Sequence, residues 1–181
     1  DNLRHCHPAV TQAIVEQAST LVQTSNQFYT VPQLLLAQLL VDNSCLDRVF
    51  FGNSGAEANE GALKLARRYG KQHRDGAYEV ITAFNSFHGR TLATVAATGQ
   101  PHYQAAFTPL LPGFVHVDYN DVEAIISATN DRTAAVMLEP VQGEGGVNIP
   151  DDDYLKRVRA WCDQQGLLLI LDEVQTGMGR L

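Results

Sequence analysis

The chain has 181 residues, 45% of them apolar and 18% charged, which is the size and composition of a globular protein with one sizeable core. Its formal net charge of −7 argues against nucleic acid or an anionic membrane surface as the main partner, and no apolar run is long enough to span a bilayer. Three widely spaced cysteines indicate no disulfide framework and favour a reducing compartment, so we expect a cytoplasmic protein.

Residues 1–47 are predicted to form a helical lead-in. One helix is expected after Pro8, where apolar residues such as Ile14 and Leu21 recur at helical spacing, and a second after Pro32. Proline suits the first turn of a helix because its missing N–H would have no partner there.

From residue 48 onward, short apolar runs alternate with helical patterns. The runs that we expect to form strands are Val49–Phe51, Glu79–Ala83, Phe114–Val117, Ala134–Leu138 and Leu167–Leu171. Strands that alternate with helices predict an α/β domain over residues 48–181, with a mostly parallel sheet covered by helices on both faces.

Helices are expected between these strands. The first begins near Ala56, and its apolar face is predicted to carry Ala58, Ala62, Leu65, Ala66 and Tyr69. The second is expected to end at Gly99.

Two further helices have recognisable ends. Asn120, followed three residues later by Glu123, has the pattern of a capping box at a helix start. The last helix is expected to open at Asp151–Asp153 and to end at Gly166. Its predicted apolar face carries Leu155, Val158 and Cys162, with Trp161 beside it.

Four polar clusters directly follow predicted strands: "GNSGA", "FHGR", "EPVQGE" and "DEVQ". The carboxyl ends of parallel strands share one edge of a sheet, and ligands bind in the crevice at that edge. The clusters are therefore expected to converge there, although they come from distant parts of the chain.

The cluster "GNSGAEANE" combines a small-residue turn with a helix start, which is a natural site for a phosphate or another anion. An ordinary tight turn capped by Asn53 or Ser54 explains the same letters. In "FNSFHGRT", Phe87 can stack on a planar ring and Arg90 can clamp a carboxylate, whereas a core phenylalanine and a solvated arginine are the plainer interpretations. His88 has no obvious acidic or metal partner in the sequence, so a structural role is expected for it.

Three other patterns leave alternatives open. Glu139 and Glu144 in "EPVQGEGG" form either an acid/base pair or ordinary loop contacts. The run "LLLILDEVQ" has the form of a Walker-B strand, but the matching phosphate loop is missing, since Gln72 follows Gly70 and Lys71. The "HCH" of residues 5–7 lacks a second ligand pair at metal-site spacing, so no metal site is predicted.

Taken in order, "HCHPAV", "FFGNSGAEANEGALKLARRYG", "FHGRTLATVAATGQPHYQ", "LEPVQGEGGV" and "LDEVQTGMGR" resemble the class-III aminotransferases, which use pyridoxal phosphate. The likeness covers nearly the whole chain and is closest to the acetylornithine and ornithine branches. It implies the large domain of the aspartate-aminotransferase-like fold.

The resemblance assigns a role to each of several residues. Asp172 would pair with the pyridine nitrogen of the cofactor and is the expected catalytic residue. Gln175 would bond the phenolic oxygen of the ring. The two faces of the ring would be covered by Phe87 and Val174, and the phosphate would be held by Ser54, Gly55 and Ala56. Arg90 would bind the α-carboxylate of the substrate, and Glu144 would gate an arginine nearer the C-terminus.

In this family the Schiff-base lysine follows the motif "DEVQTGMGR" after a further stretch, which would place it past Leu181. The three lysines present, Lys64, Lys71 and Lys156, all fall on predicted helices. We therefore expect an incomplete large domain that is inactive by itself.

The complete enzyme would be a homodimer that transfers the amino group of N-acetylornithine to 2-oxoglutarate in arginine biosynthesis. The alternatives are another class-III enzyme, acting on ornithine, succinylornithine or a γ-amino acid, and a noncatalytic phosphate- or nucleotide-binding module.

Overall fold

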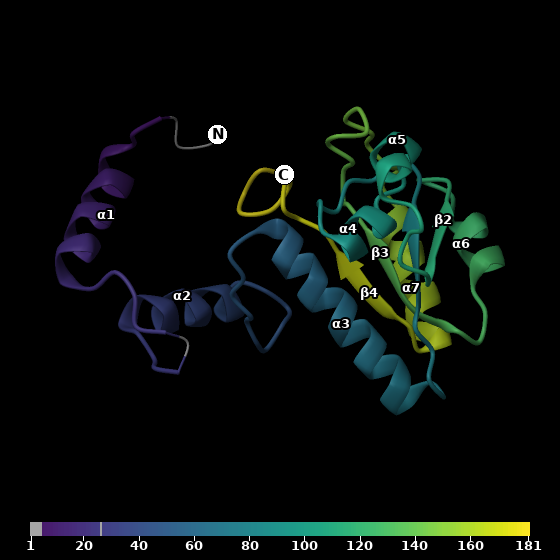
Figure 1. Ribbon diagram of the computed structural model, residues 1–181, viewed down its shortest axis with the longest axis horizontal. Coiled ribbons are helices and arrows are strands. Elements are labelled where there is room, and N and C mark those ends of the chain that lie inside the picture. Colours follow the sequence, from purple (N-terminus) through teal and green to yellow (C-terminus); the bar gives the residue numbers. More distant parts are fainter. Residues whose placement is uncertain (1–4, 26) are drawn as a thin grey trace. The chain divides into compact units, whose positions relative to one another are not determined.

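The computed structural model describes residues 5–25 and 27–181, and the chain divides into two compact units, residues 1–51 and 52–181. The first unit contains α1 (Pro8–Thr20) and α2 (Val31–Asp42), which confirms both expected helices (Figure 1). Each carries proline in its first turn, as predicted. No residue within the bounds of these two helices is buried, so the hydrophobic core of the described chain belongs to the second unit.

The second unit is built on a four-stranded parallel sheet with strand order β2-β1-β3-β4 (Figure 1). The strands are β1 (Glu79–Ala83), β2 (Phe114–Val117), β3 (Thr133–Leu138) and β4 (Leu168–Leu171). Their bounds agree with the expected strands to within one residue. A continuous apolar run therefore did predict a strand that is covered on both faces.

The strand expected at Val49–Phe51 is wrong. These three residues adopt no regular secondary structure, and no strand of the described chain pairs with them. A strand needs a neighbouring strand to accept and donate its backbone hydrogen bonds. An apolar run of three residues does not by itself ensure that such a neighbour exists.

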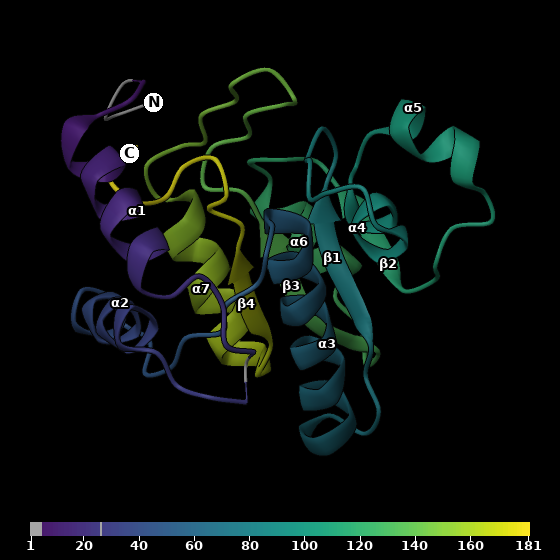
Figure 2. The same cartoon turned by 60° about the vertical axis from the view of Figure 1, so that its left-hand side comes forward.

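Helices cover both faces of the sheet (Figure 2). They are α3 (Gly55–His73), α4 (Leu92–Ala97), α5 (Pro101–Gln104), α6 (Val122–Ala128) and α7 (Tyr154–Gln165), with a 3₁₀ turn at Ala105–Phe107. The α6 and α7 helices pack on the face that carries Ile81, Val136 and Leu138. The α3 and α4 helices pack on the other face, around Val80 and Met137. The alternation of these side chains along β1 and β3 produces the expected two-sided architecture.

The buried face of α3 differs from the expected one. The helix buries Asn59, Leu63, Ala66 and Gly70, whereas Leu65 is 63% exposed. Gly70 explains the difference, because a Cβ atom there would collide with the carbonyl group of Ala77. Because Gly70 has no side chain, α3 can pack closely against the backbone of Ala77 at this point. With the Gly70 side of α3 facing inward, Leu65 faces solvent.

The expected cap of α6 is displaced by one residue. Asp121, not Asn120, accepts the N–H of Ala124 at 2.9 Å, while Asn120 has a φ of 65° and accepts the N–H of Asp151. At the end of α7, Gly166 has a φ of 63°, which confirms its predicted role.

The apolar face expected for α7 is also present. Val158 and Cys162 are buried, and Leu155 and Trp161 are partly buried against the same cluster. None of the helices in the described residues has the length and apolar content that a membrane span requires.

Candidate functional site

A cavity of about 270 Å³ lies at the carboxyl ends of β1, β3 and β4, beside the start of α3. Its lining comes from all four predicted polar clusters and consists of Gly55, Ala56, Asn59, Phe87, His88, Gly89, Arg90, Glu139, Asp172, Val174 and Gln175. The expected convergence is therefore present. The first cluster arrives through α3, which packs across β1 and β3, and not through a strand of its own.

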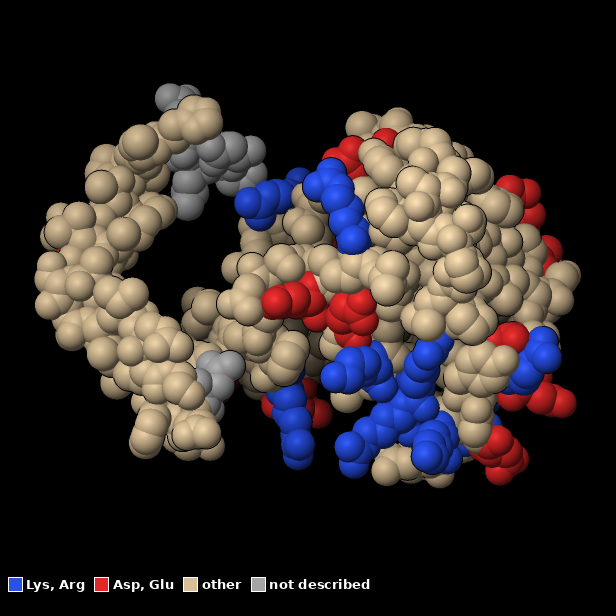
Figure 3. All heavy atoms as spheres, viewed as in Figure 1, with Lys and Arg blue, Asp and Glu red and all other residues tan. Residues whose placement is uncertain are grey.

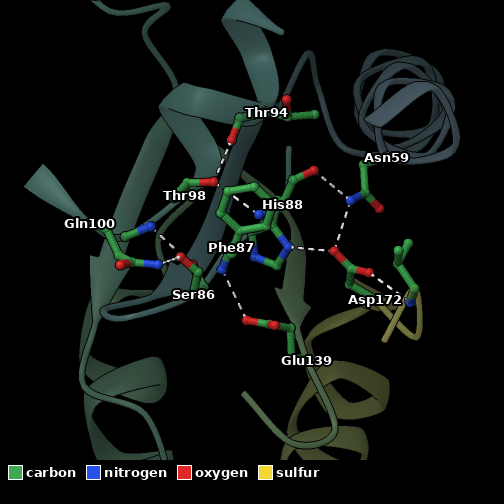
Figure 4. A network of polar contacts seen from close by, with 11 residues as sticks. Asn59, Ser86, Phe87, His88, Thr94, Thr98, Gln100, Glu139 and Asp172 are labelled. Atoms are coloured by element: carbon green, nitrogen blue, oxygen red, sulfur yellow. Dashed lines mark hydrogen bonds and ion pairs between the residues drawn. The ribbon is translucent and has the colours of Figure 1, made fainter. Parts of the chain in front are cut away.

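Asp172 lies at the centre of a buried polar network (Figure 4). Its backbone N–H donates to the carbonyl oxygen of Leu138 and so continues the pairing of β4 with β3. Its Oδ2 atom accepts from Asn59 Nδ2 and contacts His88 Nδ1, both at 2.8 Å, and its Oδ1 atom accepts from Val174 N–H at 3.1 Å. Only 6% of the residue is exposed.

These contacts decide the charge of the carboxyl group. Burial works against the ionised form, but the hydrogen bond and the electrostatic attraction of His88, with the bonds from the Val174 N–H and Asn59, outweigh it and hold the pKa of Asp172 below its usual value. The cavity therefore contains a carboxylate with little access to water. Such a group is costly to bury unless a cation meets it.

His88 has an acidic partner that was not obvious in the sequence. Its ring is fully buried, and its Nδ1 atom lies 2.8 Å from Asp172 Oδ2. Asn59 joins the same two residues, since its Nδ2 atom also donates to the carbonyl oxygen of His88 at 2.8 Å. Asp172 is 84 residues away in the chain, which is why sequence spacing gave no sign of this pair.

The loop that carries His88 is fixed by bonds to its surroundings (Figure 4). The N–H of His88 donates to Thr98 Oγ1 at 2.9 Å, and Ser86 Oγ accepts the N–H of Gly99 at 3.0 Å. Phe87 N–H donates to Glu139 Oε2 at 3.1 Å. The loop therefore presents the Phe87 and His88 side chains in a defined geometry.

Glu139 is the second buried carboxyl group of the cavity, and it is 4% exposed. Burial raises the pKa of Glu139, and the bond from Phe87 N–H offsets only part of this effect. The two carboxyl groups of the cavity thus shift in opposite directions, which is typical of sites with distinct acid and anion roles.

The start of α3 offers a place for an anion. Ser54 caps the helix, with its Oγ atom accepting the N–H of Glu57 at 3.2 Å. In the described chain, the N–H groups of Gly55 and Ala56 have no hydrogen-bond acceptor, as is usual for a first helical turn. A Cβ atom at Gly55 would come within 2.7 Å of Val174, so glycine allows Val174 to lie against this turn.

Phe87 and Arg90 form a further part of the lining. The Arg90 guanidinium lies 5.6 Å from the centre of the Phe87 ring, and Tyr103 meets that ring edge-on with its centre 5.6 Å away. Arg90 is exposed and retains donors that could bind a carboxylate.

Most of the residues singled out in the sequence meet in this cavity, with two exceptions. Ser54 caps α3 without lining the cavity, and Glu144 lies exposed in the loop after β3. Two lining residues were missed or misjudged, Asn59 and His88. A signal for Asn59 existed, since it is a polar residue at helical spacing from Leu63 and Ala66.

The lysines lie elsewhere. They are exposed residues of α3 and α7, and none lines the cavity: Lys64, Lys71 and Lys156. Lys and Arg side chains gather towards the end of α3 (Figure 3), where its sequence reads "KLARRYGKQH".

Comparisons with known proteins give a consistent result. The sequence profile of the family described as aminotransferase class-III matches residues 2–181. The chain is 58% identical to the acetylornithine aminotransferase of Methanocaldococcus jannaschii over 99% of its own length and 46% of that protein. For the acetylornithine aminotransferase of Gloeobacter violaceus the identity is 56%, over 98% of this chain and 45% of that protein. The chain thus spans about half the length of these relatives.

Solved structures of the same kind share the fold. The ornithine aminotransferase of Toxoplasma gondii ME49 aligns with a TM-score of 0.90 and 39% identity, over 96% of this chain and 42% of that one. An amine transaminase from an uncultivated Pseudomonas species, solved with pyridoxal phosphate bound, aligns with a TM-score of 0.88 and 31% identity. The alignment covers 97% of this chain and 46% of that one. The expected fold class is confirmed, and the chain belongs to the class-III aminotransferase family.

Proposed function

We propose that this chain is the cofactor-binding part of a pyridoxal-phosphate-dependent aminotransferase. The observation that carries the proposal is the buried Asp172 carboxylate, which shares one cavity with the first turn of α3. Pyridoxal phosphate has a ring nitrogen that becomes cationic and a phosphate that is anionic. The site has a matching group for each.

The residues of the cavity fit this cofactor. The free N–H groups of Gly55 and Ala56, with Ser54 at the cap, would hold the phosphate. Phe87 and Val174 would cover the two faces of the ring, because both are apolar and both line the cavity. Gln175 would bond the phenolic oxygen.

Asp172 would hold a proton on the ring nitrogen, because its carboxylate form is favoured and water has little access to it. When bound, the cofactor supplies an electron sink for the carbon that carries the amino group. Arg90 would orient the substrate by bonding its α-carboxylate in a bidentate manner. Glu144, in its exposed loop, would act on an arginine from outside the described residues.

The substrates follow from the relatives. We propose N-acetylornithine as the amino donor and 2-oxoglutarate as the acceptor, in a cytoplasmic homodimer that serves arginine biosynthesis. The identities of 58% and 56% to acetylornithine aminotransferases support this choice, compared with 39% to an ornithine aminotransferase. Ornithine is the second candidate because of the TM-score of 0.90 to that enzyme.

A comparison of amino donors tests the proposal. The intact gene product, meaning the polypeptide in which these 181 residues occur, is assayed for glutamate formed from 2-oxoglutarate. N-acetylornithine, N-succinylornithine, ornithine and 4-aminobutyrate are compared by kcat/KM. The highest value is expected for N-acetylornithine. A higher value for ornithine would overturn the substrate assignment, and pyridoxal phosphate binding without any transfer would overturn the activity.

A further inference from the structure

Arg90 lies between two residues whose positions are fixed by neighbouring helices. On one side, Gly89 has a φ of 132°, and a Cβ atom there would come within 2.8 Å of both Ala56 Cβ and Thr94 Oγ1. Gly89 therefore packs against the first turn of α3 and the first turn of α4 at the same time. On the other side, Thr91 is the N-cap residue of α4. These two neighbours determine the point from which the Arg90 side chain extends.

The Thr91 hydroxyl joins α4 to α3. It donates to Glu60 Oε1 at 2.5 Å, which is at the short end of the range for hydroxyl donors. Glu60 is 31 residues away in the chain and is half-buried. A threonine hydroxyl has one proton, so the same oxygen still accepts the N–H of Thr94 at 3.4 Å and caps α4. The bond to Glu60 and the cap of α4 are therefore compatible with each other.

Two successive turns of α3 hold the backbone around Arg90. Ala56 and Glu60 are one helical turn apart, so they lie on the same face of α3, and they meet the residues directly before and after Arg90. Beside them, Asn59 donates to the carbonyl oxygen of His88 at 2.8 Å (Figure 4). The helix that begins at the proposed phosphate site thus also fixes the backbone on both sides of Arg90.

The guanidinium of Arg90 is less restricted than its backbone. The residue is exposed, and the guanidinium lies 5.6 Å from the centre of the Phe87 ring, a contact that orients the side chain only weakly at an exposed site. A side chain with a fixed base and a mobile end reaches a limited set of positions. A shift of the base displaces that whole set relative to the cavity.

We propose that Glu60 is a positioning residue for Arg90: by accepting the Thr91 hydroxyl, it ties the start of α4 to α3 and sets the point from which the Arg90 guanidinium reaches a substrate carboxylate. This inference rests on the proposed function, in which Arg90 binds the α-carboxylate of the substrate. Glu60 does not line the cavity, so it acts through Thr91 and not by contact with the substrate. Because the turn that would hold the cofactor phosphate belongs to the same helix, α3 fixes the separation between phosphate and substrate carboxylate.

Three variants of the intact gene product and one control test the proposal. Glu60→Leu removes the acceptor and Thr91→Val removes the donor, whereas Glu60→Gln keeps an oxygen that can accept the Thr91 hydroxyl. Thr129→Val is the matched control, because the hydroxyl of Thr129 also joins two helices. It ends α6 and accepts Trp161 Nε1 of α7 at 3.0 Å, and neither residue lines the cavity.

The probe is glutarate, a dicarboxylate with the carbon chain of 2-oxoglutarate but without the oxo group, so it cannot react. Its dissociation constant is measured on the protein with pyridoxal phosphate bound, together with kcat and with KM for N-acetylornithine and 2-oxoglutarate. Glu60→Leu and Thr91→Val are expected to weaken glutarate binding and raise both KM values roughly three- to tenfold, the loss typical of one hydrogen bond. The affinity for pyridoxal phosphate and kcat should change less than about threefold, and Glu60→Gln and Thr129→Val should leave glutarate binding within about twofold of the wild type.

Two double variants show whether the effect passes through Thr91 and Arg90. Glu60→Leu combined with Thr91→Val should lose no more glutarate affinity than either single variant, because both changes remove the same bond. Glu60→Leu added to Arg90→Lys should weaken glutarate binding by less than about twofold beyond Arg90→Lys alone, because the guanidinium that Glu60 positions is already absent. A residue that only stabilised the fold would cause the same loss with arginine or lysine at residue 90.

The outcomes separate the inference from the proposed function. Glutarate affinity and KM values within about twofold of the wild type in Glu60→Leu would overturn the positioning role. Three other results would also overturn it: an equal loss of pyridoxal phosphate affinity, equal losses in Glu60→Leu and Thr129→Val with equal falls in Tm, or an undiminished loss in the Arg90→Lys background. Failure of the wild-type protein to bind pyridoxal phosphate or to transfer an amino group would instead overturn the proposed function, and this inference with it.

Discussion

Replacing Asp172 by alanine is the sharpest perturbation of the site. In the wild-type chain the carboxylate accepts bonds from Asn59, His88 and the N–H of Val174. After Asp172→Ala, Asn59 keeps the carbonyl oxygen of His88 as an acceptor, but His88 Nδ1 and the Val174 N–H have none of their present partners. The cofactor nitrogen would lose the buried counter-charge that Asp172 supplies.

The expected magnitudes differ between the free and the loaded protein. In the free protein, two unsatisfied donors cost about 1–3 kcal/mol each, but the removal of a buried charge offsets much of this cost. In the loaded protein, removing one partner of a buried ion pair costs about 3–5 kcal/mol. At about 1.4 kcal/mol per decade, that corresponds to a loss of roughly 10²-fold to several 10³-fold.

The assay compares Asp172→Ala with Glu173→Gln in the intact gene product. Glu173 is the matched control, because it is the next residue, carries the same charge and is exposed. We expect Asp172→Ala to lower cofactor affinity or kcat by the factor given above and to change the Tm of the cofactor-free protein by only a few degrees. Glu173→Gln should change neither quantity appreciably. Near-wild-type kcat and affinity in Asp172→Ala would refute the assignment of this carboxylate to the ring nitrogen.

Three further predictions concern other residues of the chain. Arg90→Lys should raise the KM of amino-acid and oxo-acid substrates alike, on the order of tenfold, because a point charge cannot replace a bidentate fork; loss of cofactor affinity at normal KM would contradict this. Because the pKa of Glu139 is raised above its usual 4.5, the contribution of Glu139 to the stability of the wild-type protein falls as pH rises from about 4.5 through the raised value. The Tm of Glu139→Gln minus the Tm of the wild type should therefore increase as pH rises above about 4.5. A decrease in this difference over the same pH range would contradict the prediction. Borohydride reduction of the intact gene product with pyridoxal phosphate, followed by peptide mapping, should leave all three lysines without stoichiometric label, since none lines the cavity: Lys64, Lys71 and Lys156.

The sequence predicted the sheet well because its strands are buried on both faces. A run such as Leu167–Leu171 has no polar residue to confuse the pattern, and the sheet edge then follows from the parallel topology. Val49–Phe51 has the same character but no neighbouring strand, and pairing is a property of the whole sheet. Residue type within a run cannot reveal whether a partner strand exists.

Site residues that directly follow a strand could be predicted from the sequence. Contacts between residues far apart in the chain could not. Asp172 could be placed from its strand alone. The bonds of His88 and Asn59 to that carboxylate span 84 and 113 residues, so no local pattern contains them. The rotation of α3 that buries Asn59 depends on a close approach at Gly70, which is visible only when the helix lies on the sheet.

The two carboxylates that directly follow β4 differ in environment, because the extended chain turns successive side chains to opposite sides. Glu173 reaches solvent, while Asp172 turns inward and meets donors from α3, from the loop after β1 and from its own chain. Those donors keep Asp172 ionised. A fold that only needed stability could place an apolar residue there at lower cost. A buried carboxylate at residue 172 is therefore explained by a cation that pairs with it. A ligand that supplies this cation would stabilise the fold through Asp172, the same residue that the chemistry of the ligand requires.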